Sequence, residues 1–400
     1  ISCLILIAAL AACDTETQVT EPPEAAASRA SNLRYGVDKL TATLGGAVNV
    51  GTSINSRSWV AGFAALAGDS VRAALWKHGT IRDLGTLGGP NSSVQWPGLN
   101  DRGMIVGIAE TDRVDPLNQD WSCSAFFPTV THKICRGFVW EDGKMRGLPP
   151  LGGRHTFATS VNSRAQVVGW AETNVRDPTC SAPQVLQFRA VMWEPRKQRN
   201  GRMKRTELRP VRGDSTSAAT GINELGQVVG ISGECDDAVG DRSATHAVLW
   251  ENGRVIEIGD LGGEFWHTPM DINDRGGVVG FGNPPGVVGG ALRPHAFLWT
   301  RHGGIQDLGT LSGDSTSQAF AINIRGEVVG RSCAGVLARC RGVIWRDGVI
   351  KDLNDLVGNF PDSLTAARDI NDDGTITGNL IELSSGKILP FVGIRRRGTS

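Results

Sequence analysis

Residues 319–330 read Ala-Phe-Ala-Ile-Asn-Ile-Arg-Gly-Glu-Val-Val-Gly, and variants of this stretch recur six more times along the chain. The asparagine that closes its apolar half marks each copy, at Asn55, Asn100, Asn162, Asn223, Asn273, Asn323 and Asn371. Spacings of 45 to 62 residues are typical of a repeat architecture in which each copy is one supersecondary unit. The sequence therefore predicts seven copies of a single unit, which we number one to seven in chain order.

Each copy resolves into four short strands. Strand one ends at the asparagine, and strand two is the Val-Val-Gly segment after a tight turn, in which Asn favours the first position and Gly supplies a positive φ. Ser58 and Ala165 replace this turn glycine in copies one and three. Strand four carries a block similar to Asp-Leu-Gly-Thr-Leu-Gly-Gly. Strand three ends in a tryptophan that we expect to pack in the core, at Trp76, Trp140, Trp193, Trp250, Trp299 and Trp345.

Copy seven, residues 369–393, has only three of these strands. The missing strand-four block stands near the other end of the chain, at residues 37–46, and we expect it to pair beside residues 389–394. The predicted fold is all-β: a seven-bladed β-propeller of four-stranded antiparallel blades over residues 37–397, closed by the N-terminal strand in the last blade. An open solenoid is the alternative, although it would not explain the split copy. A closed ring leaves no free sheet edge, so we expect a monomer.

The block at residues 295–299, His-Ala-Phe-Leu-Trp, is followed by Asp-Leu-Gly-Thr-Leu at 307–311 and by the Ile-Asn to Gly segment at 322–330. In this order the blocks resemble the extracellular repeat family named after its His-Ala-Phe signature, the HAF repeat. The resemblance covers about residues 37–393. It implies exported, propeller-like proteins whose activity is mostly undefined, and it carries no established catalytic residues.

The first twelve residues are uncharged and apolar, and they end in Leu-Ala-Ala before Cys13. This ending resembles the lipobox of bacterial lipoproteins, in which the cysteine is lipidated and becomes the new N-terminus. We expect residues 1–12 to be a signal peptide whose charged start is missing, and residues 13–36 to be the lipidated cysteine and a flexible linker. A plain secretory signal is the alternative. No later stretch has about 18 consecutive apolar residues, so we expect membrane contact through the lipid alone.

The chain has 41 Lys and Arg against 41 Asp and Glu in 400 residues, so its formal net charge is zero. This balance excludes a polycationic nucleic-acid surface, and we expect no nucleic-acid partner. The 52 glycines favour many strands joined by tight turns rather than helices. A hydrophobic content of 40% is enough for a large core.

Apart from Cys3 and Cys13, six cysteines remain, and all fall between strands two and three of their copies. An even number in an exported chain indicates disulfides. Two pairs are local, and the remaining two cysteines lie in equivalent loops of copies three and four, where they would link neighbouring units. The expected pairs are Cys123–Cys135, Cys333–Cys340 and Cys180–Cys235. A zinc site is the alternative, disfavoured because no Cys-x-x-Cys spacing occurs.

The connections between strands two and three are longest in copies two, three and four, and insertions on one face of a repeat scaffold often mark a binding face. Glutamates begin these connections, and cationic residues begin the strands opposite. One interpretation is cross-strand ion pairs, and the other is a mixed-charge patch that binds a glycan or a partner protein. Several tryptophans lie in the connections at this end of the sheets, which we call the rim, and an exposed indole there can stack on a sugar. The candidate ligand-binding residues are Glu110, Glu172, Glu234, Arg136, Arg189, Trp96, Trp121 and Trp266, with His246 opposite Glu234.

Asp369, Asn371 and Asp373, followed by Gly374, match the first half of a calcium loop, but Leu380 occupies the position of the final acid. A hairpin turn explains the same residues, so no cofactor is expected other than a weakly indicated structural calcium. The Gly-Asp-Ser-Thr-Ser segment at 213–217 and its second copy at 313–317 resemble a lipase motif. Their shared repeat position favours turn chemistry instead.

These observations favour an exported, lipid-anchored, non-enzymatic binding or scaffolding propeller of the bacterial cell envelope. The alternative is a hydrolase or lyase that acts on an extracellular polysaccharide or another polymer. Two or three carboxylates that converge on the central channel or on the long-loop rim would favour the enzyme. The candidates are Glu110, Glu172, Glu234, Asp236, Asp237 and Glu264.

Overall fold

The computed structural model describes residues 33–396, apart from 120–122, 124, 196–202, 237–240, 289–290 and 336–337. The signal peptide, Cys13, Trp121 and Asp237 lie outside the described residues. The regular secondary structure of the described residues is almost entirely β-strand, apart from a 3₁₀ turn η1 (Asp241–Ala244) and a one-turn helix α3 (Leu353–Leu356). No helix within it is long and apolar enough to cross a membrane.

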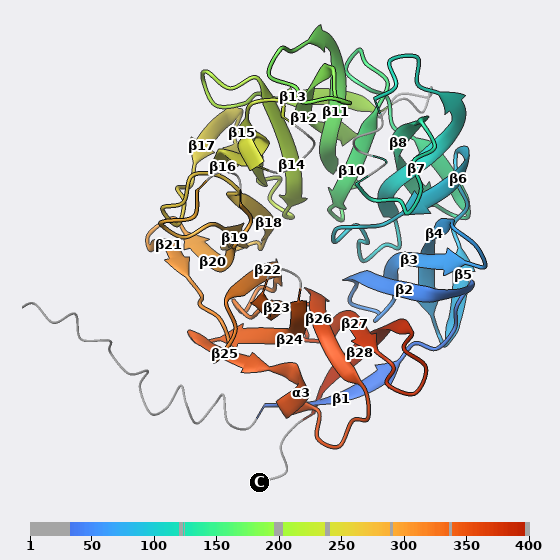
Figure 1. Ribbon diagram of the computed structural model, residues 1–400, viewed down its shortest axis with the longest axis vertical. Helices are drawn as coiled ribbons and strands as arrows, with labels where there is room; N and C mark the ends of the chain where they lie inside the picture. Colours follow the sequence, from blue (N-terminus) through green and yellow to red (C-terminus); the bar gives the residue numbers. More distant parts are fainter. Residues whose placement is uncertain are drawn as a thin grey trace, which may run out of the picture.

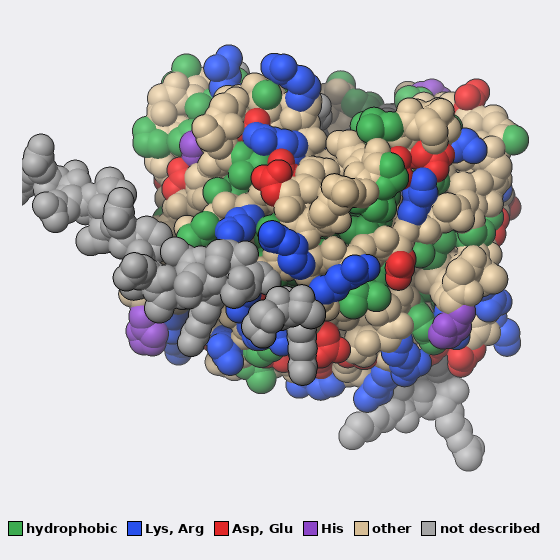
Figure 2. Space-filling view, turned by 90° about the horizontal axis from the view of Figure 1, so that it is seen from below, with side chains coloured by type: hydrophobic (Ala, Val, Ile, Leu, Met, Phe, Trp, Pro, Cys, Tyr) green, Lys and Arg blue, Asp and Glu red, His purple; other side chains and the backbone are tan. Residues whose placement is uncertain are grey.

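The strands form antiparallel sheets arranged around a common centre, the architecture of a β-propeller (Figure 1). Five sheets have four strands each, in chain order from the inside outward. The sixth has eight strands, because one parallel bridge between Val48 and Ile388 joins the strands of unit one to those of unit seven. On the side drawn in Figure 2, basic and acidic side chains lie interspersed with hydrophobic and other side chains.

Units one to three contain the following strands: β2 (Gly45–Ile54), β3 (Val60–Leu66), β4 (Val71–Lys77) and β5 (Thr80–Asp83); β6 (Gly88–Ser93), β7 (Ile105–Val114), β8 (Lys133–Glu141) and β9 (Lys144–Gly147); β10 (Thr156–Val161), β11 (Val167–Arg176), β12 (Leu186–Glu194) and β13 (Lys204–Leu208). Units four and five contain β14 (Thr216–Ile222), β15 (Val228–Gly233), β16 (His246–Glu251) and β17 (Arg254–Glu257); β18 (Thr268–Ile272), β19 (Val278–Gly282), β20 (His295–Thr300) and β21 (Gly304–Asp307). Units six and seven contain β22 (Thr316–Ile322), β23 (Val328–Gly335), β24 (Ala338–Arg346) and β25 (Val349–Asp352); β26 (Ser363–Ile370), β27 (Ile376–Ile381), β28 (Ile388–Arg396) and the N-terminal β1 (Arg34–Lys39).

The turn between strands one and two has the predicted chemistry. In unit five, Asn273 Oδ1 accepts the backbone N–H groups of Arg275 at 3.1 Å and Gly277 at 2.9 Å. Gly276 has a φ of 77°, and the residues that replace this glycine in units one and three, Ser58 and Ala165, have φ values of 56° and 61°. The side chain of the asparagine therefore holds a turn that even a non-glycine residue must enter with positive φ.

The same asparagines join each unit to the next. Asn273 Nδ2 donates to the backbone carbonyl of Asn323, and Asn323 Nδ2 donates to that of Asn371. The final bond runs from Asn371 Nδ2 to the carbonyl of Asn55, so the donors and acceptors form a cycle. All seven N–O distances are 2.9 to 3.3 Å. One residue type at one repeat position thus satisfies both the local turn and the contact between units.

The glycine that ends the Val-Val-Gly segment is required by close backbone packing. Strand one bulges toward strand two in each unit, and a Cβ atom on this glycine would lie 1.8 to 2.2 Å from a strand-one carbonyl oxygen. No side chain fits at that distance, so only glycine is sterically allowed at the last position of the Val-Val-Gly segment. The glycines are Gly62, Gly107, Gly169, Gly230, Gly280, Gly330 and Gly378.

The repeated tryptophans are buried, as predicted, with exposed fractions of 8% or less. Four of them also bind the chain segment that leads into their unit. The indole of Trp76 donates to Ala42 at 2.8 Å, and that of Trp345 donates to Leu308 at 2.9 Å, each to a backbone carbonyl. Trp193 and Trp250 make the equivalent bonds to Pro149 and Arg209. Each of these indoles therefore packs in the core and also holds the incoming chain segment through a hydrogen bond.

The N-terminal strand pairs with the C-terminal strand. β1 runs antiparallel to β28, with Val37 opposite Gly393, and the N–H of Leu40 donates to Pro390 at 2.9 Å. The paired strand covers residues 34–39 instead of the expected 37–46. Residues 41–44 lie outside the sheet and lead into unit one. The predicted linker boundary at residue 36 is wrong, since Leu33 and Tyr35 are buried in the hydrophobic cluster of the last unit.

Ion pairs reinforce this junction. Lys39 Nζ lies 2.9 Å from Asp362 and 2.5 Å from Glu382, both in or beside unit seven. Arg395 on β28 lies 2.5 Å from Glu327, which is a buried residue of unit six. Burial opposes the ionisation of Glu327, but the hydrogen bond from Asn323 and the charge of Arg395 together hold the pKa of its carboxyl below the usual range. The end of the chain is thus bound both to its beginning and to the preceding unit.

If the cycle of asparagines stabilises all units alike, Asn371→Ala should cost as much stability as Asn273→Ala. Each substitution removes one bond between units and two bonds within the turn, so we expect a loss of about 2 kcal/mol for each. Urea unfolding of both variants measures this, with the exposed Gln306→Ala as control. A harmless Asn371→Ala beside a costly Asn273→Ala would contradict the equivalence of the last bond.

Candidate functional site

The three expected disulfides are present. Cys123–Cys135 and Cys333–Cys340 close short segments within units two and six, and Cys180–Cys235 joins unit three to unit four. All three lie where strand two leads into strand three, so they tie down the connections on one rim of the molecule. Backbone bonds run beside the Cys180–Cys235 link, from Ser181 to Asp236 and from Asp236 to Thr179. The disulfides therefore fix the connections of units two, three, four and six on this rim.

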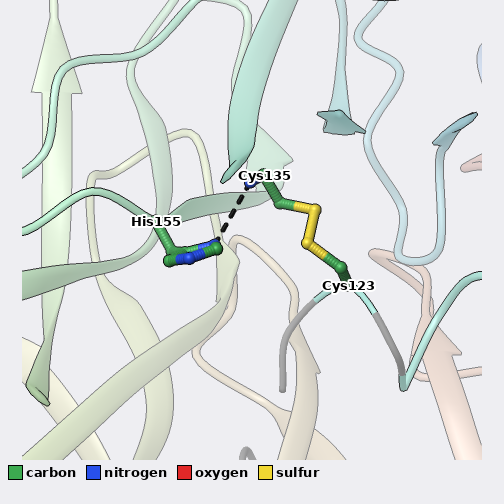
Figure 3. Close-up of side chains that lie close together, drawn as sticks. All are labelled: Cys123, Cys135 and His155. Atoms are coloured by element: carbon green, nitrogen blue, oxygen red, sulfur yellow. Dashed lines mark hydrogen bonds between the residues drawn. A yellow bond between two sulfur atoms is a disulfide. The ribbon is translucent and has the colours of Figure 1, made fainter. Parts of the chain in front are cut away.

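Cys123, Cys135 and His155 lie close enough to hold a metal ion (Figure 3). The two sulfur atoms are bonded to each other, however, and a metal would need both as free thiolates. His155 Nδ1 accepts the backbone N–H of Cys135 at 3.2 Å, and its Nε2 lies 3.5 Å from the buried carboxylate of Asp115. This geometry identifies the group as a structural link between units two and three.

The interpretation of Glu110 and Glu172 as a ligand-binding patch is wrong, because both side chains are fully buried. Glu110 accepts the backbone and side-chain N–H groups of Asn91, each at 3.0 Å, and the hydroxyl of Thr131. Glu172 accepts the backbone N–H groups of Arg154 at 3.1 Å and His155 at 3.0 Å. The carboxylates replace missing strand-to-strand hydrogen bonds where strand one begins, which leaves no acceptor facing solvent.

The expected cross-strand ion pairs are also not formed among the described residues. Arg189 lies 3.4 Å from Glu207 on the neighbouring strand and donates to the carbonyl of Ser215. His246 lies 2.9 Å from Asp214 rather than beside Glu234. Arg136 has no carboxylate in direct contact there, and burial lowers the pKa of its guanidinium, opposed by the charge of Glu172. Strand pairing places Arg136 opposite Ala109 and Arg189 opposite Ala171, so neither arginine stands opposite the glutamate that the sequence suggested.

Trp96 is not an exposed stacking platform. It is 9% exposed and packs edge-on against Phe126, Phe157 and Trp170, with ring centroids 5.4, 5.3 and 5.8 Å away. These rings belong to a hydrophobic cluster to which units one to six contribute and which we call the inner hydrophobic cluster. Trp266 is half-buried, at the edge of the rim between units four and five.

Asp369, Asn371 and Asp373 form the hairpin turn rather than an open set of oxygen ligands. Asp369 accepts the N–H of Ile54 at 2.7 Å and the hydroxyl of Ser53 at 3.1 Å, both from unit one. Asn371 Oδ1 accepts the N–H of Asp373 at 3.1 Å. The side-chain oxygens of Asp369 and Asn371 therefore serve the turn and the junction with unit one.

Asp369 and Asp271 occupy equivalent repeat positions; Asp369 is buried and Asp271 is partly buried. Asp271 accepts the N–H of Ile322 in the following unit at 2.9 Å, as Asp369 does for Ile54. Burial raises the pKa of Asp369 to about 7 and that of Asp271 to about 6, and the charge of Asp271 adds to the shift of Asp369. The two carboxyls therefore titrate near neutral pH at junctions between units.

One group of the predicted carboxylates does converge. A pocket of about 620 Å³ lies on the rim between units four and five. It is lined by Asp214, Glu234, Asp241, Arg242, Thr245, Glu264 and Phe265. Glu234 and Glu264 were singled out by the sequence, whereas Asp214 was assigned only to a turn. Asp236 lies nearby but is buried, accepting the hydroxyl of Ser181 at 3.0 Å and the N–H of Arg242 at 3.2 Å. We call this group of lining residues the acidic rim pocket.

A second pocket, of about 740 Å³, lies between units six and seven and contains Arg331 and Arg368. Neither arginine was singled out from the sequence. A signal was nevertheless present, because Arg331 follows the strand-two glycine, where units one to five carry an apolar residue. Comparing the repeats with one another would have revealed the charge at this position.

No protein-family model matches the sequence, and no curated protein matches it. Among solved structures, the β-propeller domain of the Trilobed protease from Pyrococcus furiosus, described as having an open velcro topology, is 10% identical, with a TM-score of 0.48 over 92% of this chain and 96% of that chain. A mutant of AofleA from Arthrobotrys oligospora is 10% identical, with a TM-score of 0.38 over 92% of this chain and 94% of that chain. A glucose dehydrogenase is 11% identical, with a TM-score of 0.33 over 69% of this chain and 95% of that chain. These likenesses concern the fold alone.

The disulfide between units should matter more than the local ones. Cys180 and Cys235 are 55 residues apart, whereas Cys333 and Cys340 are 7 apart. Because loop-closure entropy grows with the closed length, replacing the first pair by serine should cost about 4 kcal/mol and the second about 2 kcal/mol. Guanidinium unfolding of the two double variants measures the difference. Equal losses would show that chain entropy does not set the contribution.

Stability should fall as the pH rises through the titration of Asp369. Its pKa is raised in the folded state, so the folded protein holds a proton that the unfolded chain has lost, and a rise from about pH 4 to pH 7 favours unfolding. In Asp369→Asn this contribution is absent. The wild type should therefore lose stability relative to the variant between about pH 4 and pH 7, as measured by urea unfolding. Asp355→Asn, which removes an exposed carboxylate, is the control; an unchanged difference across this range would refute the shift.

Proposed function

We propose that this protein is an exported, lipid-anchored, non-enzymatic binding or scaffolding propeller. Its seven repeat units would be seven blades, closed by β1 in the last blade, as in the HAF-repeat proteins that the sequence resembles. The cycle of seven asparagine bonds and the pairing of β1 with β28 support this arrangement. A rigid ring presents loops at fixed positions, which suits recognition of a partner without large conformational change.

The proposed location of the protein rests on two features of the chain. Three disulfides indicate an oxidising, exported environment. The Leu-Ala-Ala-Cys ending at Cys13, which lies outside the described residues, supports attachment to a bacterial membrane through lipid. Together they favour a location in the cell envelope, where the ligand is an external glycan or protein.

The observation that carries the binding proposal is the acidic rim pocket. Glu234 and Glu264 supply acceptors for sugar hydroxyls or for basic peptide groups, and Arg242 supplies donors. Phe265 adds an aromatic ring to this polar lining, a combination suited to holding a sugar face. Backbone hydrogen bonds from Glu234 to Arg242 and from His267 to Ala244, together with the Cys180–Cys235 link, support the loops around it.

The alternative is a hydrolase or lyase that acts on an extracellular polymer. Glu110 and Glu172 weigh against it, since their oxygens are buried and bonded within the protein. The acidic rim pocket keeps it as a second candidate, because acid–base cleavage of a glycosidic bond needs two carboxyl groups that face one substrate. The carboxylates that line this pocket, and from which such a pair would come, are Asp214, Glu234, Asp241 and Glu264.

A glycan array with the purified full-length protein should give discrete hits that weaken about tenfold or more in Glu234→Gln, because the amide loses the charge that strengthens hydrogen bonds from the ligand. The matched control is Glu257→Gln, which alters an exposed residue on β17. Each hit is then incubated with the protein and its chain length measured. Intact ligand supports the binding function, whereas cleavage that Glu234→Gln abolishes supports the enzyme. Binding that is equal in both variants would place the ligand elsewhere.

A further inference from the structure

The residue after the strand-two glycine is apolar in units one to five. Four of these side chains belong to the inner hydrophobic cluster, and the fifth packs against it. They are Phe63, Ile108, Trp170, Ile231 and Phe281. In unit six the same position is Arg331, and in unit seven it is Asn379. A guanidinium thus stands at a position that the other full repeats use for the core, which is costly unless a partner compensates its charge.

Arg331 lies beside a second arginine, not beside an acid. Its Nε donates to Gln318 Oε1 at 2.8 Å, and Arg368 of unit seven lies close enough to repel it. Both guanidinium groups lie over the ring of Phe320, at 5.5 Å for Arg331 and 4.5 Å for Arg368. Among the described residues neither arginine forms an ion pair, and the buried Nε of Arg368 has no hydrogen-bond partner. Burial lowers the pKa of Arg331 to about 9 and that of Arg368 to about 10.

Both arginines line the pocket of about 740 Å³ between units six and seven. Two more arginines line it, Arg339 and Arg341, and the single carboxylate among the lining residues, Asp314, is bound by Arg341 at 2.9 Å. The lining therefore carries an excess of three positive charges. Neutral hydrogen-bonding groups complete it, from Ser363, Thr365 and Asn379.

We propose that this pocket binds an oxyanion: the carboxylate, sulfate or phosphate group of a small ligand. The fork of a guanidinium matches such a group with two hydrogen bonds, and the unpartnered Nε of Arg368 provides a donor that nothing in the protein satisfies. The ligand would replace the missing counter-charge between Arg331 and Arg368. This site is separate from the acidic rim pocket, which lies two units away and has the opposite charge.

The test is calorimetric titration of the purified full-length protein at low ionic strength with three probes: inorganic phosphate, inorganic sulfate and glucuronate. We expect saturable binding of at least one probe. Arg331→Ile and Arg368→Gln should each weaken it about tenfold or more, because each removes a charge-assisted donor pair. Arg254→Gln, which alters an exposed arginine on β17, should leave it unchanged. Glucuronate as the tightest probe would indicate a sugar acid, whereas phosphate or sulfate would indicate a free or esterified inorganic group.

Arg331→Ile also separates binding from a structural role. It installs the residue that unit four has at this position, Ile231, and removes the repulsion with Arg368. In ligand-free buffer the variant should therefore unfold at a higher temperature than the wild type while it loses the anion. The proposal is overturned if none of the three probes binds saturably, or if Arg331→Ile and Arg254→Gln bind alike. Glu234→Gln should bind the anion normally, so failure of this site is distinguishable from failure of the acidic rim pocket.

Discussion

The hydrogen bond from each repeat asparagine to the backbone carbonyl of the next repeat asparagine is the interaction on which the rest of the structure depends. The oxygen of the same side chain holds the turn of its own unit, so local and global order use one residue. Alanine would lose both functions, and aspartate would lose the donor. Because the bond from Asn371 returns to Asn55, the two ends of the chain are subject to the same constraint as its middle.

This constraint leaves the rim connections free to vary. The junctions between units repeat the same backbone geometry, yet one pocket is lined by Asp214, Glu234 and Glu264, whereas another is lined by Arg331 and Arg368. Neither set takes part in the cycle of asparagines or in the close packing at the strand-two glycines. The scaffold can therefore carry recognition chemistry of opposite sign on one rim without changing how the units are held together.

Much of the site was not predictable residue by residue. Glu110 looked like a surface acid because it begins a long connection, but its carboxylate lies inward and binds the backbone of Asn91. Trp96 looked like an exposed indole for the same reason, and it is a core residue. Position in a loop does not determine the direction of a side chain, since that direction depends on which unsatisfied backbone groups or apolar surfaces the neighbouring unit presents.

The sequence by itself determined the four-strand unit, its seven copies and the positive-φ turns, because each follows from a local steric requirement that recurs in every copy. It also indicated the cysteine pairs, because all six cysteines fall in the same connection of their copies. It also indicated that the first strand belongs beside the last one. Only the tertiary structure decided which carboxylates are buried, which cationic residues meet an acid, and that Arg331 and Arg368 share a pocket without a counter-charge. Those outcomes depend on side-chain contacts between units. The number of residues between two such side chains does not predict how close they lie in space.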